Sequence, residues 1–107
     1  MNTDNKTGGP PGKRRVRALE REKTRVRQTV PDLIAREAAE IASRQHENRA
    51  VALDEIRQRV THNQGVLFER AFFECLAEWL QARSHEAATV AVRAFIEAHL
   101  DIDLRKV

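Results

Sequence analysis

The residues that could ligate a metal or act as nucleophiles are few and far apart. The chain has 107 residues with four histidines and one cysteine, and no two histidines are three or four residues apart. Because zinc sites usually draw on closely spaced His and Cys ligands, we expect no metal site. Cys75 follows Phe72 and Phe73 in an apolar run, which disfavours its thiolate. We therefore expect a buried, reduced thiol, as in a cytoplasmic protein.

Other residue types that support catalysis are also poorly placed. Ser43 and Ser84 are the only serines, and both suit helix ends or the surface. The carboxylates are spread over predicted helix faces at spacings typical of solvated charge. Three of the four glycines lie within residues 1–12, so no glycine loop can cradle a phosphate. We predict a protein that is not an enzyme, has no cofactor or small-molecule substrate, and lacks an apolar run long enough to span a membrane.

Positive charge is concentrated near the N-terminus. Residues 1–30 hold nine basic and three acidic residues, whereas residues 31–107 hold ten basic and thirteen acidic residues. Arginine matches the geometry of phosphate groups, so this asymmetry predicts contact with DNA, with RNA as the less favoured partner. The predicted contacts are Lys13, Arg14, Arg15, Arg17, Arg21, Lys23, Arg25 and Arg27.

The elements expected to present this charge are a flexible arm and a short strand. Residues 1–12 are rich in Gly and Pro, and residues 13–24 carry few apolar groups, so residues 1–23 are predicted to form a flexible, disordered basic arm. Val26 and Val30 then alternate with Arg25, Arg27 and Thr29. This two-residue period predicts a strand over residues 25–30, ended by Pro31.

The rest of the chain predicts about four helices, which makes the fold class mainly α. The apolar stripe of residues 34–42 is out of phase with that of residues 53–60 by roughly a third of a turn. Two helices joined by a short turn at residues 44–47 explain this offset more simply than the alternative of one long helix. Asn48 is the predicted N-cap of the second.

Two further helices, over residues 66–83 and 85–100, are predicted to form a C-terminal hairpin with Ser84 as an N-cap. Their apolar faces are wide and contain every aromatic residue of the chain. We expect these faces to bury against a second subunit in a homodimer or tetramer, or to bind another protein. The predicted interface residues are Phe68, Phe72, Leu76, Trp79 and Phe95.

Residues 24–60 resemble a ribbon-helix-helix DNA-binding module of the Arc/MetJ type. The match comprises the strand TRVRQTVP, the proline-initiated helix PDLIAREAAEIASRQ and the second helix NRAVALDEIRQRV. The resemblance implies that two subunits pair their strands in the DNA major groove, with Arg25, Arg27 and Thr29 reading bases. It also implies that the backbone amides of Asn48 and Arg49 hold a phosphate at the start of the second helix.

Together these features divide the chain into a flexible arm at residues 1–23, a DNA-binding module at 24–62 and a helical oligomerisation region at 63–107. The leading hypothesis is a sequence-specific DNA-binding protein, acting as a repressor or as an accessory factor, for example of a mobile element. The alternatives are a helical adaptor that binds another protein, and an RNA-binding protein that uses the arginine-rich arm.

Overall fold

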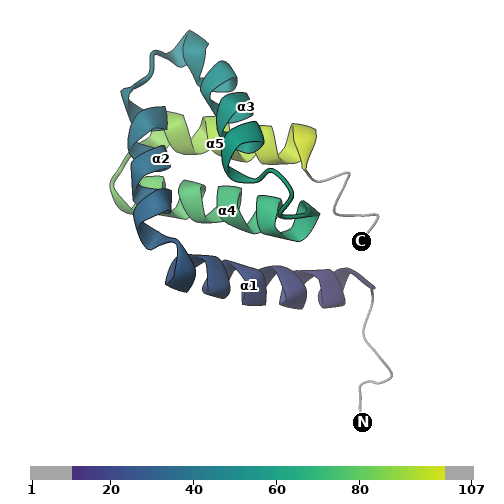
Figure 1. Cartoon of the computed structure of the whole chain (residues 1–107). Coiled ribbons are helices and arrows are strands. Elements are labelled where there is room, and N and C mark those ends of the chain that lie inside the picture. The colour runs from purple at the N-terminus through teal and green to yellow at the C-terminus, as the bar shows by residue number, and fades with distance from the viewer. Residues whose placement is uncertain (1–10, 101–107) are drawn as a thin grey trace.

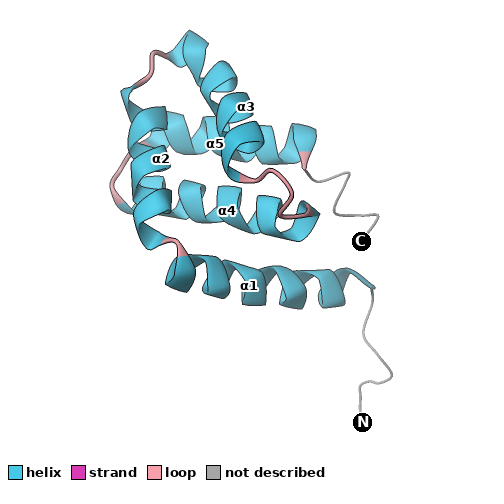
Figure 2. Ribbon diagram, viewed as in Figure 1, coloured by secondary structure: helices cyan, strands magenta, loops and turns pink. Residues whose placement is uncertain are grey.

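The computed structural model describes the backbone of residues 11–100 and the side chains of residues 17–100, and every regular element in this part of the chain is a helix, with short loops between the helices (Figure 2). The predicted mainly helical fold is therefore confirmed. Residues 1–10, for which disorder is predicted, lie outside the described residues, and so does the C-terminal tail, residues 101–107. The helices are α1 (Pro11–Thr29), α2 (Pro31–Ser43), the 3-10 helix η1 (His46–Asn48), α3 (Arg49–Val60), α4 (Val66–Ala82) and α5 (Glu86–His99).

The largest difference from the sequence-based expectation is α1. It replaces the flexible arm over residues 11–23 and the strand over residues 25–30, so both predictions are wrong there. Leu19 and Val26 are buried and Val30 packs at the edge of the core. Their spacing of seven and four residues fits one face of a helix as well as the valines alone fit a strand. The helix forms because its apolar face packs against the apolar side chains of α4.

Pro31 separates α1 from α2 as predicted, although it ends a helix and not a strand. The amide of Val30 donates to the Val26 carbonyl at 3.0 Å, and the amide of Ile34 donates to the Val30 carbonyl at 3.1 Å. Proline has no N–H of its own and suits the first turn of a helix. The chain therefore changes direction at Val30 with few backbone groups left unpaired.

The prediction of two helices within residues 31–60 is confirmed. Helix α2 ends at Ser43, and α3 begins at Arg49 after η1. Ile41 and Leu53 are both buried, on opposite sides of this turn. The phase offset therefore corresponds to a break between α2 and α3, which lets the apolar stripes of both helices face the same core.

Helix α4 lies at the centre of the molecule, between α1 and α5 (Figure 1). It also contacts α2, and its apolar side chains are covered on several sides. Phe72 and Phe73 are completely buried. The wide apolar face of α4, expected to need a second subunit, is thus covered by helices of the same chain, namely α5, the unexpected α1 and α2.

The C-terminal hairpin of α4 and α5 forms as predicted, but its turn differs from the prediction. Ser84 has φ 63° and follows the end of α4, and it does not cap α5. Its amide donates to the Gln81 carbonyl, while the amide of His85 donates to the Leu80 carbonyl. This is the Schellman pattern, in which a left-handed residue closes a helix C-terminus. His85 is the residue that precedes α5.

Candidate nucleic-acid interface

Three of the four exposed basic side chains described on α1 lie along one face of this helix. Arg17, Arg21 and Arg25 are exposed and follow one another at intervals of four residues, with the exposed Gln28 in phase with them. Residues so spaced lie on one side of a helix, here over about 12 Å from Arg17 to Arg25. We call these four residues the outer face. It contains no acidic side chain.

The arginines of the outer face differ in whether they form an ion pair within the described chain. Arg25 forms an ion pair with Glu22 one turn before it, which also raises the pKa of Arg25 through a hydrogen bond and charge attraction. Arg17 and Arg21 have no ion pair or hydrogen bond within the described part of the chain. These two guanidinium groups can therefore meet an external anion without first losing an internal partner.

Lys23, predicted to contact DNA, points the other way. Its side chain is 8% exposed, and its Nζ atom lies 2.5 Å from Glu78 Oε2 on α4. Burial opposes the charge of Lys23, but the hydrogen bond and attraction from Glu78, with help from Glu20 and Glu74, raise its pKa above the ordinary value. Lys23 is therefore an inward cation that fastens α1 to α4.

Arg27 shares the same acid. Its Nη1 atom lies 3.0 Å from Glu78 Oε1 and 3.8 Å from Cys75 Sγ. Cys75 is buried, as predicted, and its thiol donates to the Lys23 carbonyl at 3.6 Å. Burial raises the pKa of Cys75 to about 11 despite the nearby cations. Glu78 thus neutralises two of the predicted DNA contacts, a role that no local sequence pattern indicated.

The reading residues and phosphate site implied by the resemblance are arranged differently from the expectation. Thr29 lies in α1, and its hydroxyl donates to the Arg25 carbonyl at 2.8 Å. The amide of Asn48 donates to the Gln45 carbonyl, and that of Arg49 to the His46 carbonyl. Both amides are thus used inside η1, so the predicted phosphate site is not open. The side chain of Asn48 makes no capping hydrogen bond to α3.

Three other predicted contacts fall at the edge of the described region. Lys13, Arg14 and Arg15 belong to the first turns of α1, but their side chains lie outside the described residues. They extend the basic sequence of the helix toward its N-terminus. Their contribution to binding stays a prediction.

The predicted oligomer interface is largely core. Phe72 and Leu76 are fully buried, and Phe68 and Phe95 are 8% and 7% exposed, so these four side chains offer almost no surface to a partner. Their assignment to an interface is wrong because α1, α2 and α5 already cover them. Trp79 differs: it is partly exposed, and the Arg83 guanidinium lies 3.5 Å from its ring centroid.

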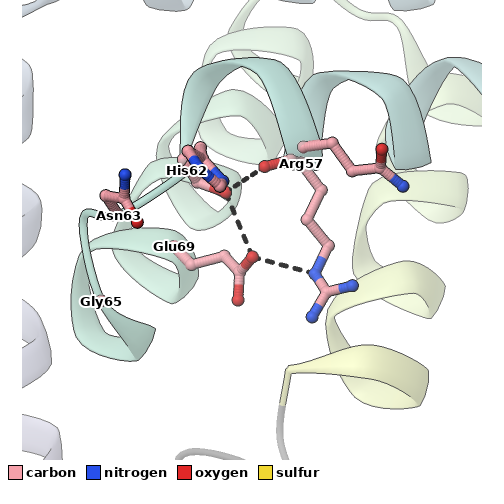
Figure 3. Close-up of a pocket in the computed structure, with 7 residues that line it drawn as sticks. Arg57, His62, Asn63, Gly65 and Glu69 are labelled. Carbon is pink, nitrogen blue, oxygen red and sulfur yellow. Dashed lines mark hydrogen bonds and ion pairs between the residues drawn. The ribbon is translucent and has the colours of Figure 1, made fainter.

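A polar pocket of about 730 Å³ lies where α3 ends and α4 begins (Figure 3). Glu69 of α4 accepts a hydrogen bond from Arg57 Nε at 2.9 Å, and its Oε2 atom lies 3.1 Å from Thr61 Oγ1. No local sequence pattern indicates this pairing, since the residues are 8 and 12 positions apart. The cluster ties two helices together and leaves neither charge unpaired. The lining residues are Arg57, Gln58, Thr61, His62, Asn63, Gly65 and Glu69.

A groove of about 320 Å³ between α3 and α5 is more apolar. Leu53, Phe95 and four alanines line it together with His46, Arg49 and His99, and no acidic residue does. The Nε atom of Arg49 is buried there without a hydrogen-bond partner among the described residues. The groove is therefore an apolar surface edged by groups that can donate hydrogen bonds.

The described residues form neither a metal site nor a membrane-spanning helix. No group of three or more His, Cys, Asp or Glu residues in the described region could hold a metal ion. Within residues 11–100, no helix is both long and apolar enough to cross a membrane. The chain matches no family model, and the comparisons with curated proteins and with solved structures found no match.

Proposed function

We propose that this chain is a non-enzymatic DNA-binding protein that contacts the phosphate backbone and major groove through the outer face of α1. The observation that supports this most is the pair of exposed arginines, Arg17 and Arg21, one turn apart and without an internal partner. A helix fits in the major groove of B-DNA, and arginine is the side chain best suited to phosphates and guanine edges.

The docking of α1 on α4 strengthens the proposal in a specific way. A flexible arm loses conformational freedom when it binds, whereas a helix already packed through Leu19 and Val26 presents its arginines in a fixed arrangement. The proposed interface therefore uses a rigid helix in place of the paired strands of a ribbon module. A role as repressor or accessory factor in the cytoplasm fits this mode of binding.

Salt-dependent binding to duplex DNA tests the proposal. The variant Arg17→Gln/Arg21→Gln removes two outer-face charges. The control Arg36→Gln/Arg83→Gln removes two exposed charges elsewhere, which pair with Glu37 and stack on Trp79. Each lost phosphate contact lowers the slope of log affinity against log salt by about 0.9, so the first variant should lose about 2 and the control about 0.

Fluorescence anisotropy with a labelled random-sequence duplex of about 20 base pairs, about two helical turns, provides the readout. Circular dichroism checks that both variants keep the helical content of the native chain. Equal slopes for the two variants would refute the outer face as the binding site. Tighter binding to single-stranded RNA of the same length would favour the RNA alternative, and no binding to either would leave the adaptor hypothesis.

A further inference from the structure

A pocket of about 360 Å³ lies at the corner where α1 ends, α2 begins and α4 ends (Figure 1). Helix α1 contributes Arg27 to its wall, and α4 contributes Glu78 together with Arg83 just after its last turn. A site that joins an apolar wall to a few charged groups from separate elements is typical of pockets for small ligands. The apolar part of the lining consists of Pro31, Ile34, Cys75, Trp79 and Ala82.

The charged groups of this pocket leave an excess of positive charge. Glu78 is the one acidic residue among the described lining residues, and its two carboxylate oxygens already pair with Lys23 and Arg27. Arg83 forms no ion pair or hydrogen bond within the described part of the chain, and its guanidinium lies against the ring of Trp79. The lining therefore carries two arginines and one carboxylate, and Arg83 is the cation left without an anion.

The volume and the charge together define the class of ligand. At roughly 30 Å³ for each water-sized group, the pocket holds about twelve non-hydrogen atoms. One excess positive charge matches a carboxylate, whereas a phosphate monoester carries nearly two negative charges at neutral pH. Arginine can bind a carboxylate through two parallel hydrogen bonds, and the apolar wall gains free energy by covering an apolar body.

We propose that this pocket binds a small aromatic carboxylic acid, with the carboxylate on Arg83 and the ring packed against Ile34 and Trp79. Aromatic rings pack well against an indole edge and against a guanidinium plane, and both are present here. A ligand in this position contacts α1, α2 and α4 at once, so it stabilises the folded chain by mass action. The proposal goes beyond the proposed function and can fail independently of it, since ligand binding is measured without DNA.

Trp79 makes this site directly observable, because it is the only tryptophan of the chain and the chain has no tyrosine. Titration of the full chain with 4-phenylbutyrate, an acid of the size that the pocket admits, should give a saturable change in tryptophan fluorescence. The expected Kd is about 1 mM or tighter. The neutral analogue 4-phenylbutanol keeps the apolar body and lacks the charge, so it should bind at least about tenfold more weakly. Sodium acetate at the same concentrations controls for ionic strength and should give no saturable change.

Thermal denaturation gives a second readout that does not depend on the fluorescence of Trp79. At about five times its Kd, 4-phenylbutyrate should raise the Tm by roughly 4–8 °C. Arg83→Gln should weaken binding of the acid at least about fivefold, because it removes the guanidinium that meets the carboxylate. Arg93→Gln is the matched control, because Arg93 is exposed on α5 and does not line the pocket.

Three results would each overturn the proposal. One is the absence of saturable binding by 4-phenylbutyrate in both readouts. Another is equal affinity for the acid and the alcohol, which would mean that the positive charge of the pocket does not select the ligand. The third is equal affinity of Arg83→Gln and Arg93→Gln for the acid, which would place the binding site elsewhere on the molecule.

Discussion

The ion pairs around Glu78 make a sharp prediction about how α1 is held. In Glu78→Gln, the Lys23 ammonium keeps its buried place but loses the carboxylate 2.5 Å away, and Arg27 loses its partner at 3.0 Å. Removing one partner of a fully buried pair costs roughly 3–5 kcal/mol. Glu78 is 39% exposed, so water can partly replace its carboxylate. We therefore expect a loss of about 2 kcal/mol in the free energy of unfolding.

Urea and thermal denaturation, followed by circular dichroism at the helical band, measure this loss. For a domain of this size, about 2 kcal/mol corresponds to a fall in Tm of roughly 10 °C. Glu97→Gln is the matched control, because Glu97 is exposed on α5 and should change stability by less than about 0.5 kcal/mol.

A second substitution separates the charge from the packing. Lys23→Met added to Glu78→Gln removes the stranded ammonium and keeps most of the buried aliphatic stem, so the double variant should recover much of the lost stability. If Glu78→Gln unfolds with the same free energy as the native chain, the inward cations do not hold α1, and the argument that separates them from the outer face fails.

Three other predictions concern the thiol and the turn before α4. Because the pKa of Cys75 is raised to about 11 and the residue is buried, maleimide or iodoacetamide should label it at pH 8 at least about 100-fold more slowly in the folded chain than in urea. The raised pKa of Cys75 also means that the fold keeps the contribution of this thiol at pH 8 and loses it as the pH rises past about 9 toward 11, so the urea midpoint should fall over that range. A flat midpoint would contradict the burial of this thiol. Gly65→Ala should lower the free energy of unfolding by about 1 kcal/mol, since Gly65 has φ 94° while an added Cβ meets no atom within 4 Å. Gln64→Ala is the control, and an equal effect of the two substitutions would show that the positive φ carries no cost.

Much of the fold was predictable from local pattern. Pro31 begins α2, and the apolar stripes around Ile41 and Leu53 require a break between α2 and α3. Gly65 precedes α4, and the short link after Arg83 forces the hairpin with α5. Each of these features depends on residues within a few turns of one another, so periodicity and turn chemistry are sufficient to predict it.

The candidate sites depended on contacts that are distant in sequence. Val26 and Val30 satisfy both a two-residue period and a helical spacing, and only the apolar side of α4 selects the helix. Glu78 lies 51 residues from Arg27, so no local pattern could indicate which cations of α1 pair with α4.

The sequence by itself therefore determined the mainly helical composition, four of the five α-helices and the concentration of positive charge in residues 13–27. The tertiary structure decided which charges face outward, because α1 docks on α4 and turns Lys23 toward Glu78 while Arg17 and Arg21 stay exposed. It also decided which apolar residues stay exposed. Burial depends on which faces of distant helices meet, and that is a property of the whole fold and not of any single segment.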